Sequence, residues 1–220
     1  MGLLDDLKKQ AELAKSQQIS EKSLQAESLK VVETKAKQTF QYLNDLLKQL
    51  AVLKPVNPLN FSIPSVTELK NLSYLDSFID SRKKSVSDIE VIDTISFYIK
   101  WGSAAKINIE KDMPAPAQKI RDGLTQNGVK FAEDEMRSPR GTIAGWKFTV
   151  DQAINTDVKI TADHANLRLL IAGRNLIRLG SDDFVVPILE ITEEWLEEFA
   201  KSLLGHPSGL QKYKVQTPFR

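Results

Sequence analysis

The chain has 220 residues, 41% of them hydrophobic and 27% charged, which is typical of a folded globular protein and excludes a largely disordered one. Its 30 basic and 29 acidic side chains nearly cancel, so the bulk charge indicates neither a nucleic acid nor an anionic membrane as partner. Cysteine is absent, which excludes disulfides, thiolate metal sites and a cysteine nucleophile.

The first residues do not resemble a targeting segment. Asp5 and Asp6 precede any apolar stretch, so a secretory signal is not expected. No window of the sequence approaches 18 consecutive apolar residues, so we expect no transmembrane segment. We therefore expect a cytoplasmic protein.

Residues 1–54 are predicted to form a helical arm. Residues 3–53 contain neither Gly nor Pro and are rich in strong helix formers. One apolar stripe at helical spacing runs through the second half: Leu29, Val32, Ala36, Phe40, Leu43, Leu47, Leu50. A shorter stripe runs through the first half: Leu4, Leu7, Ala11, Ala14. The polar segment 16–21 lies between them, so the sequence allows one long helix or two helices.

A stripe of this length must pack against something. The candidates are the chain's own second domain and a protein partner, including another copy of the chain. Coiled-coil pairing would explain the stripe, but Gln18, Glu21 and Lys35 lie near seam positions and make the heptads imperfect. Both alternatives stay open at this point.

Residues 55–85 are predicted as a Pro-rich connection followed by a short helix. Pro55, Pro58 and Pro64 prevent the arm from continuing. Ser65 followed by Glu68 matches a capping box, and the expected helix would carry an apolar face of Leu69, Leu72, Leu75, Phe78.

Residues 86–205 are predicted to form an α+β sheet domain. Apolar residues alternate with polar ones from Ile89 to Trp101, which indicates a strand with one buried face. Gly102 and Ser103 are expected to turn the chain into a partner strand containing Ile107 and Ile109. Further strands are expected at 129–133, 142–150, 157–162, 167–172 and 176–179, joined by hairpins that include a turn at residues 180–183.

Two helices belong to this domain. One is expected at residues 117–126, ended by Asn127 and Gly128. The other begins after Thr192 as N-cap and stops at Gly205. Residues 206–220 form a tail that is either frayed or docked as an edge strand, with Tyr213, Val215 and Phe219 spaced along it. The predicted fold class is α+β, with a mainly antiparallel sheet of about five to seven strands, covering helices and a long helical arm.

The sequence contains no recognisable catalytic or nucleotide-binding motif. With two histidines and no cysteine, we predict no metal site and no cofactor. His164 could act as a general base with a neighbouring aspartate, but a role in its turn is favoured. His206 is expected to interact with the end of the last helix. Asp93 interrupts an apolar face, and we favour a position at the exposed end of the sheet.

Charged residues of the later strands are expected to be solvated. The acidic residues 133–135 alternate between the faces of a strand and cannot all bind one cation. Basic residues recur on the polar sides of the strands: Arg137, Arg140, Lys147, Lys159, Arg168, Arg174, Arg178. Acidic residues lie nearby and no aromatic residues interleave with them in sequence, so no nucleic-acid partner is expected.

Four aromatic residues, Phe97, Trp101, Trp146 and Phe148, fall on inward positions of two strands. Such rings are either core or the lining of a pocket for a small apolar ligand. We predict a non-enzymatic assembly or adaptor protein whose arm mediates self-association or partner binding. A carrier or sensor of a small apolar ligand, held between sheet and helices, is the alternative, and an enzyme of unrecognised type is a third possibility.

Overall fold

The computed structural model describes the backbone of residues 3–86 and 89–215 and the side chains of these residues from Ala26 onward. The helices are α1 (Leu3–Leu53), α2 (Pro114–Gln126), α3 (Glu193–Leu203) and the short 3-10 helices η1 (Ile188–Glu190) and η2 (Gly209–Tyr213). The strands are β1 (Val56–Asn57), β2 (Phe61–Ile63), β3 (Thr67–Leu69), β4 (Leu72–Val86), β5 (Ile89–Lys111), β6 (Phe131–Arg137), β7 (Ile143–Asp163), β8 (Arg168–Arg174) and β9 (Ser181–Pro187).

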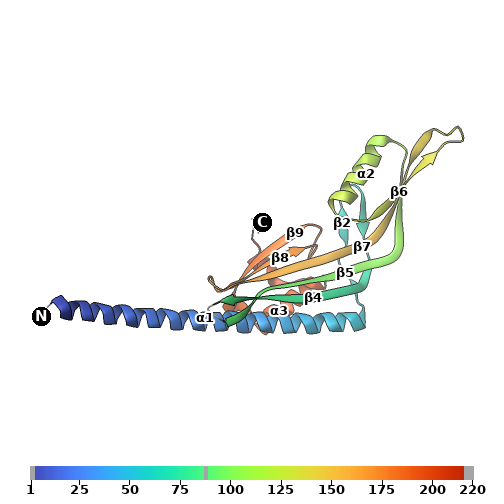
Figure 1. The fold of residues 1–220 in the computed structure, drawn as a ribbon. Helices are drawn as coiled ribbons and strands as arrows, with labels where there is room; N and C mark the ends of the chain where they lie inside the picture. Colours follow the sequence, from blue (N-terminus) through green and yellow to red (C-terminus); the bar gives the residue numbers. More distant parts are fainter. Residues whose placement is uncertain (1–2, 87–88, 216–220) are drawn as a thin grey trace.

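The architecture is α+β, as predicted. A seven-stranded antiparallel sheet has the order β1-β4-β5-β7-β8-β9 with β6 beside β7, and β2 and β3 form a separate hairpin. The sheet curls as a half-barrel, with α1 running along β4 and α2 lying near β6 at the other end (Figure 1). One continuous cluster of buried residues joins α1, the sheet, α2 and α3.

Two long strands, β5 and β7, pair with each other at the centre of the sheet. β5 pairs with β7 from Thr94 to Gly102 and again from Lys106 to Lys111, with an irregularity between the two stretches. Along the first stretch β8 is the other neighbour of β7, and along the second stretch β6 takes that place. The predicted turn at Gly102 and the predicted break between residues 150 and 157 are therefore wrong. A Cβ on Gly102 would lie 2.5 Å from Leu75 Cδ1, so glycine serves close approach of a side chain here.

The helix predicted after Ser65 is also wrong. Ser65 has a φ of 62° and turns β2 into β3, and Asn71 with a φ of 53° turns β3 into β4. A register shift between Tyr74 and Asp76 then changes which β4 side chains face the core. Because of these irregularities, apolar residues that lie three apart in the sequence belong to strands, although their spacing resembles one face of a helix. Leu75 and Phe78 of this set are exposed.

The strand predicted at residues 176–179 is a loop, and β9 begins where the turn at residues 180–183 was expected. Asn175 closes this loop with a φ of 56°, which asparagine tolerates better than most residues. Its Nδ2 donates to the carbonyl of Asn155 at 2.9 Å, and its Oδ1 accepts from the N–H of Gly180 at 3.1 Å. Side-chain bonds of this kind leave no periodic signal in the sequence.

The later helices agree with the predictions. Gly128 follows α2 with a φ of 67°, and Thr192 Oγ1 accepts from the N–H of Trp195 at 3.2 Å as the N-cap of α3. In the tail, Lys214 forms a bridge with Phe184 of β9 and the N–H of Val215 donates to the carbonyl of Asp183 at 2.9 Å. The described part of the tail is therefore docked on β9, and Phe219 lies outside the described residues.

Candidate functional site

The apolar stripe of the arm packs against the chain's own sheet. α1 is one continuous helix, and five of the seven predicted stripe residues are buried in the common core: Val32, Ala36, Leu43, Leu47, Leu50. Leu29 and Phe40 are partly buried, and Phe40 packs against this core. The stripe of residues 29–50 is therefore occupied within one chain, while the first-half stripe of Leu4, Leu7, Ala11 and Ala14 lies outside the described side chains.

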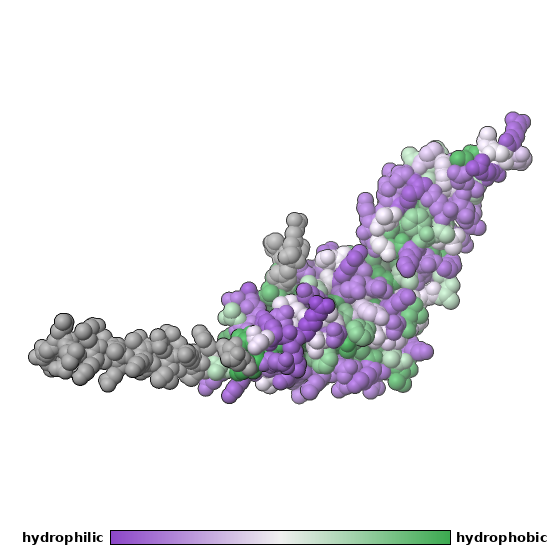
Figure 2. Space-filling model, viewed as in Figure 1, coloured by the Kyte–Doolittle hydropathy of each residue, from purple (hydrophilic) through white to green (hydrophobic). Residues whose placement is uncertain are grey.

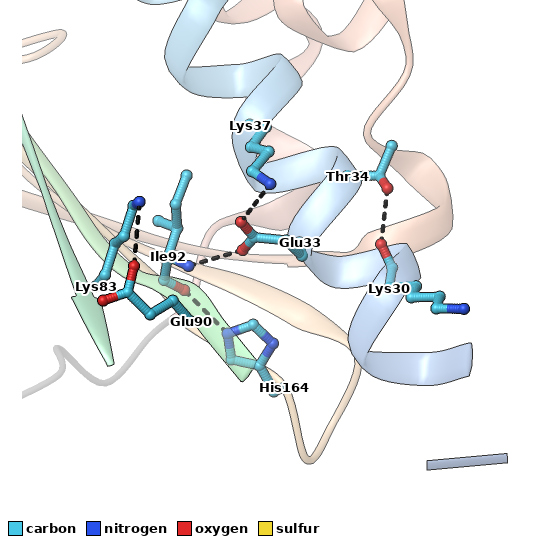
Figure 3. Close-up of polar contacts among 8 residues, drawn as sticks. All are labelled: Lys30, Glu33, Thr34, Lys37, Lys83, Glu90, Ile92 and His164. Carbon is cyan, nitrogen blue, oxygen red and sulfur yellow. Dashed lines mark hydrogen bonds and ion pairs between the residues drawn. The ribbon is translucent and has the colours of Figure 1, made fainter. Parts of the chain in front are cut away.

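Two polar side chains bind the backbone of one β5 residue, Ile92, just beyond the end of the pairing of β5 with β7 (Figure 3). The N–H of Ile92 donates to Glu33 Oε2 of α1 at 2.7 Å, and the carbonyl of Ile92 accepts from His164 Nε2 at 2.9 Å. Because a carbonyl oxygen can only accept, Nε2 of His164 carries a proton. The two side chains satisfy backbone groups that the β5–β7 ladder no longer reaches and join α1 to the sheet.

Asp93 follows Ile92 at this end of the sheet, and the bond of His164 to Ile92 gives His164 a structural role. Asp93 is the extra residue of a bulge, since Arg82 pairs with Thr94 and Lys83 pairs with Ile92. It is partly exposed and forms an ion pair with Lys84 at 2.7 Å. Its position at the sheet's end agrees with the favoured interpretation of the sequence.

Replacing Glu33 with alanine is expected to lower the free energy of unfolding by about 1.5–3 kcal/mol, because a hydrogen bond to a charged group is lost and the buried N–H of Ile92 is left without a partner. Urea denaturation measures this change, and amide hydrogen exchange at Ile92 should accelerate. The matched control is Lys37→Ala, which removes only the exposed partner of the 3.0 Å ion pair with Glu33 and should cost less than about 1 kcal/mol. Equal losses for the two variants would contradict this role of Glu33.

An apolar hollow lies beside α1 where its described side chains begin. We call it the root groove and define it by Ser28, Val31, Leu167, Pro187 and Leu189. The groove comprises two adjoining hollows, of about 440 and 750 Å³, and Ser28 and Leu167 line both of them. Val31 and Leu167 are each 39% exposed, and Leu189 is 78% exposed. Figure 2 shows hydrophobic residues at the surface at this end of the body.

Leu167 is held in the root groove in an uncommon backbone conformation. Its φ of 51° lies in the left-handed region, which is unfavourable for leucine. Asp163 fixes the preceding turn by accepting from Asn166 and from Arg168 Nε at 2.8 Å. Burial alone would raise the pKa of Asp163, but these hydrogen bonds outweigh it and hold the pKa below its ordinary value.

The four aromatic residues of the predicted pocket occupy the core or its margin. Phe97 meets Phe199 edge-on at 6.4 Å between ring centroids, and Trp101 meets Tyr74 edge-on at 6.3 Å. Phe148 is fully buried, and Trp146 is partly buried. The rings therefore fill space beneath the helices, an arrangement that adds no support to the apolar-ligand alternative.

The charged residues highlighted by the sequence separate into different environments. Three of the basic residues form ion pairs: Arg137 with Glu135, Arg168 with Asp163, Arg178 with Asp182. Lys159 and Arg174 share one face of the sheet, whereas Arg140 lies in the hairpin between β6 and β7. Over residues 26–86 and 89–215, no group of three or more His, Asp or Glu side chains is arranged to hold a metal ion.

Sequence reasoning missed the root groove, because its residues come from α1, the β7–β8 turn and the segment after β9. Comparison with models of protein families, with curated proteins and with solved structures found no match. In the described part of the chain, no helix combines the length and apolarity needed to cross a membrane.

Proposed function

We propose that this protein is a non-enzymatic assembly protein whose arm associates with a second copy of the chain at the root groove. The observation that supports the proposal is the exposed apolar surface of Val31, Leu167 and Leu189, next to the helix that continues from it. Exposed apolar side chains gathered around a groove are typical of interaction surfaces. A cytoplasmic location belongs to the same proposal and is compatible with the cysteine-free sequence.

The association is assigned to the part of α1 that precedes Ala26. The buried stripe residues from Val32 to Leu50 belong to the core of their own domain, so these side chains cannot also pair with a partner while the fold is intact. Residues 3–25 continue the same helix over roughly 35 Å at about 1.5 Å per residue. Their sequence carries its own apolar positions, including Leu4, Leu7 and Ala11.

A two-fold arrangement with antiparallel arms fits the charges along α1. If Leu4 of one copy lies beside Val31 of the other, Asp5 comes opposite Lys30 and Lys8 comes opposite Glu27. Both Lys30 and Glu27 are exposed beside the root groove. A shift of three residues, which brings Leu7 beside Val31, places Lys8 opposite Lys30, and like charges at such positions are unfavourable. The first register is therefore the proposed one.

Sedimentation velocity over a range of protein concentrations tests the proposal. We expect a dimer for the intact chain, and we expect Leu189→Glu to raise the dimer dissociation constant about tenfold or more by placing a charge in the apolar contact. The matched control is Val52→Glu at the other end of α1, because Val52 is also 78% exposed but lies outside the groove. This control should leave the dissociation constant unchanged.

A truncated chain that begins at Ala26 provides the second measurement. It keeps the buried stripe and should fold as a monomer, whereas removal of residues 1–54 would also delete core residues such as Leu43 and Leu47. A monomeric intact chain at tens of micromolar, or a truncated chain that dimerises as tightly as the intact one, would contradict the proposed function.

A further inference from the structure

A second surface, distinct from the root groove, lies on the face of the sheet that is turned away from the α1 and α3 core. Alternate residues of the strands face the core, as Val158 and Ile160 do, and those between them face outward. Outward residues of five strands line a hollow of about 580 Å³, a volume within the range of small-molecule sites. We call this surface the outer shelf, and its central residues are Phe78, Tyr98, Asp157, Lys159 and Arg174.

Strand pairing places four of these residues in one row across the sheet. Phe78 pairs with Tyr98, Tyr98 pairs with Asp157, and Asp157 pairs with Arg174. Lys159 lies two residues from Asp157 on β7 and is the diagonal neighbour of Arg174. Neighbouring strands are about 4.8 Å apart, so the row runs from an aromatic end to a basic end over roughly 14 Å.

The aromatic end presents an exposed platform. Phe78 is 59% exposed, and its ring lies 6.4 Å from that of Tyr98 with the planes inclined by 30°. The hydroxyl of Tyr98 donates to Asp76 Oδ2 at 2.9 Å, which holds this ring at the edge of the shelf. That hydrogen bond also raises the pKa of Tyr98 above its ordinary value, so the phenol stays neutral. Flat aromatic ligands stack on exposed rings of this kind.

The other end of the row carries the cations Lys159 and Arg174, in a hollow that the carboxylates of Asp80, Asp157 and Asp183 also line. Across residues 26–86 and 89–215, Lys159 and Arg174 form no hydrogen bond or ion pair. The guanidinium of Arg174 reaches the turn after α2, where a Cβ on Gly128 would lie 3.3 Å from Arg174 Nη2. A guanidinium and an ammonium on neighbouring strands suit a phosphate group, which accepts several charged hydrogen bonds at once.

Asp157 lies between the two ends and is exposed. A carboxylate only accepts hydrogen bonds, and a pair of hydroxyl groups such as those of ribose could donate to it at this position. The row therefore presents an aromatic platform, a hydroxyl acceptor and a phosphate-binding pair in the order in which a nucleotide carries its base, ribose and phosphate. We propose that the outer shelf binds a nucleoside monophosphate.

In the proposed pose the base stacks on Phe78 and Tyr98, the ribose hydroxyls donate to Asp157, and the phosphate accepts from Lys159 and Arg174. The roughly 10 Å between Tyr98 and Arg174, two strand spacings, matches the reach of one nucleotide. No aromatic residue lies between Lys159 and Arg174 in the sequence. Pairing of β4 with β5 and of β5 with β7 brings the two rings beside them.

Isothermal titration calorimetry on the intact protein tests the proposal with AMP, GMP, CMP and UMP as probes, and with adenosine, ribose 5-phosphate and inorganic phosphate as partial ligands. We expect at least one monophosphate to bind at one site per chain and at least about tenfold more tightly than its partial ligands. Equal binding of inorganic phosphate and the monophosphates would reduce the shelf to a phosphate site and overturn the proposal.

Two variants assign the binding to the shelf. Arg174→Gln should weaken binding of the monophosphate about tenfold or more, with little effect on adenosine. Phe78→Ala should weaken binding of both the monophosphate and adenosine. Because the Phe78 side chain is exposed, this variant should keep the fold, which circular dichroism checks directly. The matched control is Arg140→Gln, an exposed arginine of the β6–β7 hairpin, and it should bind as the unmodified protein does.

Three results would contradict the proposal. One is the absence of binding by all four monophosphates at millimolar concentration. Another is equal weakening by Arg174→Gln and Arg140→Gln, which would indicate a general charge effect. The third is a single-stranded oligonucleotide that binds far more tightly than any monophosphate, which would assign the shelf to a nucleic acid. Since the shelf and the root groove share no residues, the oligomeric state does not bear on any of these outcomes.

Discussion

Replacing Leu43 with alanine is expected to lower the free energy of unfolding by about 2–5 kcal/mol, because truncation of a fully buried leucine removes apolar contact and leaves a cavity. Leu43 has no exposed surface and belongs to the cluster that joins α1 to the sheet and α3. Urea denaturation followed by circular dichroism measures the change, provided that the unmodified protein and the variant both show two-state transitions.

The matched control for Leu43 is Leu53→Ala on the same helix. Leu53 is 71% exposed, so its truncation should change the free energy of unfolding by no more than about 0.5 kcal/mol. If Leu43→Ala changed only the oligomeric state and left the stability of the monomer intact, the stripe would be an interface between chains. That outcome would contradict the packing of α1 on its own sheet.

Replacing Trp101 with alanine is expected to cost about 3–5 kcal/mol, the range for loss of a large buried aromatic side chain. Trp101 is fully buried on β5 and packs edge-on against Tyr74. The loss is measured as a shift in the urea midpoint and in the thermal transition. A loss of less than about 1 kcal/mol in the free energy of unfolding would indicate that the rings do not fill the core. That result would support a pocket for an apolar ligand.

Trp101→Phe separates packing from polarity at the same position. Nε1 of Trp101 is buried without a hydrogen-bond partner among the described residues, and such a donor is unfavourable in a core. Phenylalanine keeps a ring against Tyr74 and removes that donor, so this variant should be clearly more stable than Trp101→Ala. Equal losses for the two substitutions would mean that the ring itself contributes little.

The elements predicted correctly are those whose signals are local. Alternation from Ile89 to Trp101 predicted the first half of β5, and Thr192 with the acidic residues after it predicted the start of α3. The errors fall where a residue serves a distant contact. Gly102 resembled a turn, but it makes room for Leu75 of the neighbouring strand. The segment around Asn71 resembled a helix, but Asn71 turns the chain from β3 into β4.

The candidate sites were harder to predict for the same reason. Periodicity showed that one face of α1 is apolar, but it cannot identify the surface that covers that face, so Leu43 and Leu47 suited a core and an interface equally well. The root groove combines Val31 with Leu167 and Leu189, and the outer shelf combines Phe78 with Arg174. Strand pairing brings the shelf residues together, and the packing of α1 on the sheet brings together those of the groove.

The most direct test of the proposed assembly is site-directed disulfide cross-linking. The chain contains no cysteine, so chains carrying only Leu4→Cys can be mixed with chains carrying only Val31→Cys and oxidised. The antiparallel register predicts a cross-linked dimer from this mixture and much less from Leu7→Cys mixed with Val31→Cys, because a disulfide requires Cα atoms within about 7 Å. No cross-link from the first mixture, or a stronger one from the second, would contradict the proposed contact between the arm and the root groove.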